Sequence, residues 1–181
     1  GNYINDIKQN SNSNDEEFAG GIVAILETAT IENSKNTGNV IGSTNIGGIA
    51  GESKGTITQC RNDGQVSKVA GVICKTVNLG GLVGKNGEAA RLSNSKNYGN
   101  VNSETDTLVN LGGICGILYN NSIVELCENN GAISGSGKEI IPNEDTNTNC
   151  ASCTSNNGGS ASTDDFGQLN IGIIYGKYQE I

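Results

Sequence analysis

Residues 79–101 read "LGGLVGKNGEAARLSNSKNYGNV", and this stretch joins the two motifs that recur along the chain. Its second half belongs to an eleven-residue motif with four copies: "TIENSKNTGNV" (30–40), "TITQCRNDGQV" (56–66), "RLSNSKNYGNV" (91–101) and "IVELCENNGAI" (123–133). Its first half is a Gly-Gly motif that also reads "GGIVA" (20–24), "GGIAG" (47–51) and "GGICG" (112–116). The first glycines are 27, 33 and 32 residues apart, intervals that are typical of repeat arrays.

Aligning the copies places apolar residues in three columns. These columns hold Ile31, Ile57, Leu92 and Val124; Val40, Val66, Val101 and Ile133; and Ile22, Ile49, Leu82 and Ile114. One repeat offers about three short strands and cannot bury its apolar face alone. Coils stacked about 4.8 Å apart would bring each column into register as a narrow core. Because helical periodicity is absent and glycines are frequent, we predict an all-β fold, a β-solenoid of about four to five coils.

Polar residues align as well. The motif predicts an asparagine ladder at Asn36, Asn62, Asn97 and Asn129, with a glycine two residues after each. Stacked amides can hydrogen-bond along the coil axis, and both residue types tolerate the positive φ of a tight corner. An outward, solvated column is expected at Lys35, Arg61, Lys96 and Glu128. The odd spacing between Ile57 and Cys60 predicts a bend there.

Composition narrows the class of protein. The 181 residues suffice for one structural unit, with 27 Gly, no His, Trp or Met, and only 4% aromatic residues. A net charge of −8 and 11 scattered Lys and Arg argue against nucleic acid and anionic membrane partners. No window approaches the roughly 18–20 apolar residues of a membrane span. The missing initiator Met predicts a processed product or excised fragment, as signal-peptide removal would give.

The Gly-Gly strand, the polar turn and the pattern S/C-x-N-x-G-x-V together resemble the GLUG repeat, with residues 79–101 as the best copy and 18–135 as the extent of the similarity. GLUG repeats occur in bacterial surface adhesins and in non-catalytic regions of IgA-specific metallopeptidases. The resemblance implies a right-handed parallel β-helix at the cell surface or outside the cell, and it implies no activity.

The remaining segments depart from the repeat. We expect an N-terminal arm at 1–17, a polar insertion loop at 136–165, and a terminal strand or cap at 166–181. Residues 67–78 and 102–110 lengthen two coils. Loops on one side of an array are where partners usually bind.

The side chains offer little catalytic chemistry. Without His there is no Ser-His-Asp or Cys-His arrangement, no HExxH zinc site and no imidazole ligand. Four acidic residues of the insertion could form a catalytic carboxylate pair or a calcium site: Glu144, Asp145, Asp164 and Asp165. The alternative is that they are solvated charges of a loop. We therefore predict no enzyme, no metal and no cofactor.

The six cysteines divide by column. Cys60 and Cys127 share the column of Ser34 and Ser95, and Cys115 shares that of Val83, so all three should be small buried fillers. Cys60 and Cys127 lie two coils apart, about 9.6 Å, which is too far for a disulfide.

The "CASC" stretch would suit a local disulfide between Cys150 and Cys153. Cys74 could pair with the insertion, with another subunit or with nothing, and Asn120 begins a glycosylation triplet.

The sequence supports two hypotheses about function. The first is a non-enzymatic extracellular structural protein that self-assembles into a filament, sheath or layer, because uncapped strand edges template pairing. Its copies would join through the solenoid ends, with residues 1–17 as the bridge. The alternative is an adhesive module for a glycan or host protein. Sugar-binding faces usually expose aromatic rings, and the repeats offer only Tyr98 and Tyr119 for this purpose.

Overall fold

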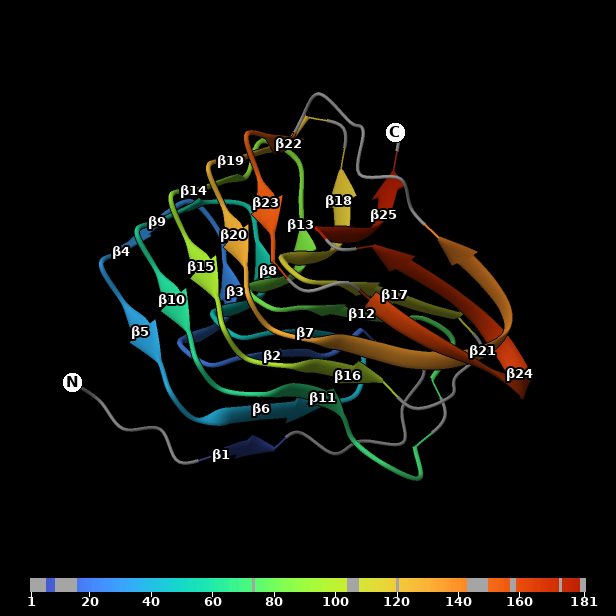
Figure 1. Cartoon of the computed structure of the whole chain (residues 1–181). Helices are drawn as coiled ribbons and strands as arrows, with labels where there is room; N and C mark the ends of the chain where they lie inside the picture. Colours follow the sequence, from blue (N-terminus) through green and yellow to red (C-terminus); the bar gives the residue numbers. More distant parts are fainter. Residues whose placement is uncertain are drawn as a thin grey trace.

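The structure is a computed structural model that describes residues 6–8, 16–72, 74–103, 108–119, 121–142, 150–156, 159–172 and 174–179. Every regular element in these residues is a β-strand, and the strands pair in parallel with those one coil away. The predicted all-β solenoid is confirmed (Figure 1).

Each coil consists of short strands separated by tight corners. The first contains β2 (Phe18–Gly20), β3 (Val23–Leu26), β4 (Thr30–Glu32), β5 (Lys35–Asn36) and β6 (Asn39–Gly42). The second contains β7 (Asn45–Gly47), β8 (Ala50–Ser53), β9 (Thr56–Thr58), β10 (Arg61–Asn62) and β11 (Val66–Lys68). The third contains β12 (Val77–Gly80), β13 (Val83–Asn86), β14 (Arg91–Ser93), β15 (Lys96–Asn97) and β16 (Val101–Ser103).

The fourth coil contains β17 (Leu108–Gly112), β18 (Cys115–Tyr119), β19 (Ile123–Glu125), β20 (Glu128–Asn129) and the long β21 (Ile133–Pro142). The fifth contains β22 (Cys150–Ala151), β23 (Thr154–Ser155), β24 (Gly159–Gly172) and β25 (Tyr175–Gln179). A further strand, β1 (Asp6–Lys8), precedes the coils. The chain thus repeats one path until β21, where the strands become longer.

Equivalent strands of successive coils stack into sheets. Three sheets of five strands run from β3 to β25, from β4 to β22 and from β5 to β23. A ten-stranded sheet holds both the first and the last strands of the coils, because β24 pairs with β21 and with β17. In Figure 1, β21 and β24 form a ribbon that extends beyond the stacked coils and folds back.

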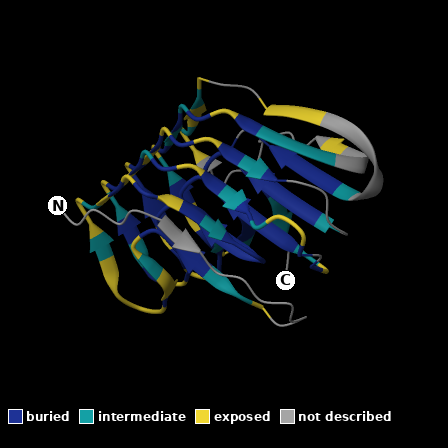
Figure 2. Ribbon diagram, turned by 90° about the horizontal axis from the view of Figure 1, so that it is seen from below, coloured by how far each residue is buried: buried dark blue, intermediate teal, exposed yellow. Residues whose placement is uncertain are grey.

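Apolar side chains line the inside of the stack as two clusters. Figure 2 shows how the buried residues follow the strands of the stacked coils. Ile57, Leu92 and Val124 stack in register and belong to one cluster. The column of Val40, Val66, Val101 and Ile133 belongs to the other. Each fully buried side chain of this size stabilises the fold by roughly 1.5–3 kcal/mol.

Two predicted core residues of the first coil differ from their columns. Ile22 is 39% exposed, whereas its equivalents Ile49, Leu82 and Ile114 are buried, and Ile31 is only partly buried. The prediction of a core position is therefore wrong for Ile22. Both residues lie in the outermost coil, and within the described residues no strand stacks on the outer side of β3 or β4.

The stretch 136–165 is not simply an inserted loop. β22 pairs with β19 and β23 with β20, so residues 150–155 continue the repeat as part of a fifth coil. β24 and β25 complete this coil on β17 and β18, which places the terminal segment in the stack. The terminal strand predicted at 166–181 thus lies in the fifth coil, but the sequence prediction missed β22 and β23, because the inward Val124 is replaced by Cys150 and the ladder Asn129 by Ser155.

Each end of the stack carries one additional strand. At the first coil β1 pairs with β6, with Ile7 opposite Val40. At the other end residues 139–142 of β21 pair with residues 168–171 of β24. Each additional strand covers only one of the columns at its end, so the edges of β2, β3, β4 and β5 stay uncovered by described residues.

Candidate functional site

The predicted asparagine column forms a continuous buried ladder. Nδ2 of Asn36 donates to Oδ1 of Asn62 at 2.8 Å, Asn62 to Asn97 at 2.9 Å, and Asn97 to Asn129 at 2.8 Å. In the fifth coil Ser155 ends the series by accepting from Asn129 at 3.2 Å. Because these amides are buried, each needs all its partners within the protein.

Each ladder amide also closes a local turn. Asn62 donates to the carbonyl of Gly64 at 2.8 Å, and the Gly64 N–H donates back to Oδ1 at 3.2 Å. A Cβ on Gly64 would lie 1.9 Å from the carbonyl oxygen of Gly38, so glycine is needed for the close approach of neighbouring coils. The expectation of positive φ at the Asn and Gly columns is wrong.

Positive φ occurs instead three residues before each ladder position. The residues concerned are Asn33, Gln59, Asn94, Leu126 and Ser152. Gln59 lies between Ile57 and Cys60, where the odd spacing predicted a bend, and its φ is 54°. The position accepts several residue types, which explains why it did not stand out in the aligned motif.

A second asparagine ladder runs through the first strands of the coils. Asn78 donates to Asn45 at 2.7 Å, Asn110 to Asn78 at 2.6 Å, and Asn170 to Asn110 at 2.6 Å. Its donors point toward the first coil, opposite to those of the other ladder. Sequence reasoning missed it, although the signal is present as an Asn two residues before the glycine in "NIGG", "NLGG", "NLGG" and "NIGI".

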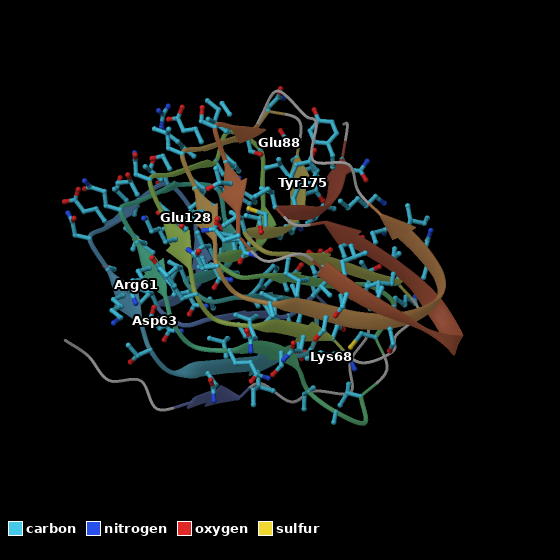
Figure 3. The ribbon with its side chains drawn as sticks, in the orientation of Figure 1. Arg61, Asp63, Lys68, Glu88, Glu128 and Tyr175 are labelled. Atoms are coloured by element: carbon cyan, nitrogen blue, oxygen red, sulfur yellow. The ribbon has the colours of Figure 1, made fainter. Side chains whose placement is uncertain are left out.

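The outward column carries ion pairs on the surface of the solenoid. Lys35, Arg61, Lys96 and Glu128 lie in register. Asp63 contacts Arg61 at 2.5 Å and Lys35 at 2.8 Å, and Arg61 also lies 4.2 Å from the ring centre of Tyr98. Arg61 and Asp63 are labelled in Figure 3. Burial alone would raise the pKa of Asp63, but the hydrogen bonds from Arg61 and Lys35 lower it below its usual value. The Tyr98 ring therefore packs against Arg61 of the outward column.

A polar groove is a concave candidate site. A hollow of about 490 Å³ is lined by Glu16, Glu52, Lys54, Lys85, Gly87, Glu88 and Tyr119. An adjoining hollow of about 320 Å³ shares Glu16, Lys85 and Tyr119 and continues along Asn45, Asn78 and Asn110 of the second ladder. The stacked strands β8, β13 and β18 supply Glu52, Lys85 and Tyr119, so the groove follows from the coil geometry.

Lys85 lies at the centre of this groove. Its Nζ contacts Glu16 at 3.1 Å and Glu52 at 3.5 Å, and Glu52 is buried. Burial lowers the pKa of Lys85, but the hydrogen bond that Lys85 donates to Glu16 and the charges of Glu52 and Glu16 outweigh it, so the pKa is raised. The ammonium group stays charged near neutral pH. The groove thus offers a fixed cation, carboxylate acceptors and one tyrosine.

The cysteine column continues into the fifth coil. Cys60, Cys115 and Cys127 are buried among apolar residues, and Cys153 follows Cys127 in the same column because Thr154 pairs with Glu128. Burial raises the pKa of the Cys60 thiol and of the Cys115 thiol. Cys74 is buried in the other apolar cluster. The Cys150 side chain lies outside the described residues, so its predicted disulfide with Cys153 stays a prediction.

The remaining sequence candidates lie outside the described part of the chain. Glu144, Asp145 and Asn120 lie outside the described residues, as do the side chains of Asp164 and Asp165 on β24. In the described part of the chain no three His, Cys, Asp or Glu side chains are grouped to hold a metal ion. The same residues contain no helix of the length and apolarity that crossing a membrane requires.

Comparisons with family models, with curated proteins and with solved structures gave no match to this chain. The function proposed below therefore rests on the motifs and the geometry.

Proposed function

We propose that the chain is a non-enzymatic structural component of the extracellular space or a cell surface, whose copies associate end to end through the first coil. The observation that carries this proposal is the exposure of Ile22. The residues at its position in the next three coils are buried, and each of those coils has a neighbouring coil on both sides. A coil from a second copy would bury Ile22 and pair the uncovered edges of β3 and β4.

The similarity of the motifs to GLUG repeats supports a setting at the cell surface. The two ladders support a structural role, since they connect every coil along the axis through buried amides. Assembly of the copies into a filament, sheath or layer would extend the same stacking.

Substitution of Ile22 by lysine should abolish association, because a charged side chain at the contact would lose its hydration when a second coil covers it. The matched control is Ile123→Lys, since Ile123 is similarly exposed, at 44%, but lies on the outer surface of the fourth coil. We expect wild-type protein and Ile123→Lys to gain mass with concentration in light scattering, and Ile22→Lys to remain monomeric. Equal association of all three proteins would overturn the proposed contact.

The N-terminal arm was expected to bridge copies. Residues 6–8 pair with β6 of their own chain, so a bridge would require exchange of β1 between copies. Residues 16 and 17 should be kept in a truncation, because Glu17 accepts a hydrogen bond from the Asn45 N–H at 2.9 Å. We expect the chain lacking residues 1–15 to associate like the full chain. A monomeric truncated chain would assign the contact to β1 exchange instead.

A second candidate function is adhesion, with a glycan as the ligand of the groove and a host protein as the other partner class. Tyr119 favours it, because this ring lines both hollows beside the ion-paired Lys85. Aromatic faces stack on sugar rings, and charged neighbours supply hydrogen bonds.

Tyr119→Ala should weaken any binding to an immobilised glycan array, since it removes the only ring lining the described groove. Tyr98→Ala is the control, because Tyr98 lies on the repeat face against Arg61. A loss of at least about tenfold in apparent affinity is expected for Tyr119→Ala alone, which corresponds to one lost stacking contact of about 1.4 kcal/mol. Identical array profiles, or no bound glycan with wild-type protein, would remove the adhesive function.

A further inference from the structure

Cys127 and Cys153 occupy the same position in two neighbouring coils. Glu128 pairs with Thr154 and Asn129 with Ser155, and each cysteine directly precedes its strand. The Thr154 N–H donates to the carbonyl of Cys127 at 2.9 Å, which fixes the spacing at this point. Strands in a sheet lie about 4.8 Å apart, within the Cα separation of about 4.4–6.8 Å that disulfides require.

The two side chains also have the same orientation. Sγ of Cys127 lies 3.4 Å from the carbonyl oxygen of Glu125, and Sγ of Cys153 lies 3.8 Å from that of Ala151, in both cases two residues earlier. The sulfur atoms are therefore stacked along the coil axis. A side-chain hydrogen bond between the two cysteines, together with burial, raises the pKa of the Cys127 thiol.

The other buried cysteines of this cluster have no cysteine as a register neighbour. Cys60 occupies the same column two coils earlier, but its neighbours there are Ser34 and Ser95. Cys115 has Val83 and Tyr175 as its strand partners. Among the cysteines with described side chains, only Cys127 and Cys153 are register neighbours.

We propose that Cys127 and Cys153 form a disulfide that fastens the fifth coil to the fourth. The half-buried Cys153 is the thiol that a small-molecule disulfide reaches first. Exchange forms a mixed disulfide on Cys153 and releases one thiol. Cys127 then attacks the Cys153 sulfur and displaces the second thiol. The protein loses two electrons and two protons, and the donor disulfide is reduced to two thiols.

The bond would enclose the long excursion of the chain between the two coils. The enclosed residues include β21, and the chain rejoins the stack at β22. A cross-link of this kind limits the freedom of the unfolded chain. It holds the last coil at a place where the ladder changes from Asn129 to Ser155.

Peptide mapping distinguishes this bond from the predicted Cys150–Cys153 bond. Trypsin cleavage after Lys96, Lys138 and Lys177 separates Cys127 from both Cys150 and Cys153. The folded full chain is oxidised with oxidised glutathione, alkylated and digested without reductant. We expect peptides 97–138 and 139–177 to be linked in the wild type. Two unlinked peptides, with or without a bond inside 139–177, would overturn the proposal.

Serine variants complete the test. Cys127→Ser is suited to it, because Ser34 and Ser95 already occupy this column. We expect the link to be lost in Cys127→Ser and Cys153→Ser, and to be retained in Cys60→Ser, Cys115→Ser and Cys150→Ser. Oxidation should raise the melting temperature of the wild type by roughly 5–10 °C and leave that of Cys127→Ser unchanged. A link that survives in Cys127→Ser would assign the bond to Cys115 and contradict the proposal.

Discussion

Replacing Gly81 with alanine should destabilise the protein by about 3 kcal/mol or more, because the new methyl group would overlap the asparagine ladder. A Cβ at Gly81 would lie 2.2 Å from Nδ2 of Asn97 and 2.2 Å from the carbonyl oxygen of Gly113. The first atom is fixed by ladder hydrogen bonds, and the second belongs to the backbone of the next coil. Neither can move without breaking contacts in two coils.

The matched control is Gly87→Ala. A Cβ there would find its nearest neighbours at 3.3 Å, one of them in the flexible side chain of Lys54. We expect a change within about 1 kcal/mol. Urea unfolding followed by circular dichroism measures both variants. Similar losses of stability in the two would show that the second glycine of the motif does not define the close packing against the ladder.

Asn62→Leu should be nearly as damaging, with an expected loss of about 3–5 kcal/mol, because it leaves buried polar groups without partners. Asn62 exchanges hydrogen bonds with Asn36 and Asn97 in the neighbouring coils and with both backbone groups of Gly64. Leucine has a similar volume, so the loss would come from unpaired groups rather than from a cavity.

Lys96→Ala serves as the comparison for this variant. Lys96 pairs with Glu128 at 2.8 Å, but half of its side chain is exposed. Exposed ion pairs contribute little, so little change in the melting temperature is expected. Equal melting temperatures for Asn62→Leu and Lys96→Ala would contradict a structural role for the ladder.

The fold was predictable because its repeated positions allow only one residue type or a few similar ones. Asn62 and Gly64 cannot be exchanged for similar residues, so their spacing is visible in every full copy of the motif. The β22 and β23 part of the fifth coil was not predictable, because there Cys150 and Ser155 keep the backbone path but lose the apolar and amide residues that mark it. Backbone pairing in a parallel stack tolerates such changes in the last coil, because that coil stacks on another coil on one side only.

The groove could not be predicted from the motifs. Its central contact joins Glu16 to Lys85 across 69 residues of sequence, and Glu16 lies outside the aligned repeats. Glu52 and Lys85 are stacked neighbours, but their column also holds Ile25 and Ile117, so it shows no common residue type. Glu16 reaches Lys85 only because residues 16 and 17 run beside β7.

Small-angle X-ray scattering of the full chain over a range of concentrations tests end-to-end association most directly. One chain has a mass of 18.6 kDa. The proposed structural role predicts that the scattering mass rises to multiples of this value while the particle lengthens and its cross-section stays constant. A mass of one chain at every concentration, or growth that widens the cross-section, would contradict association through the first coil.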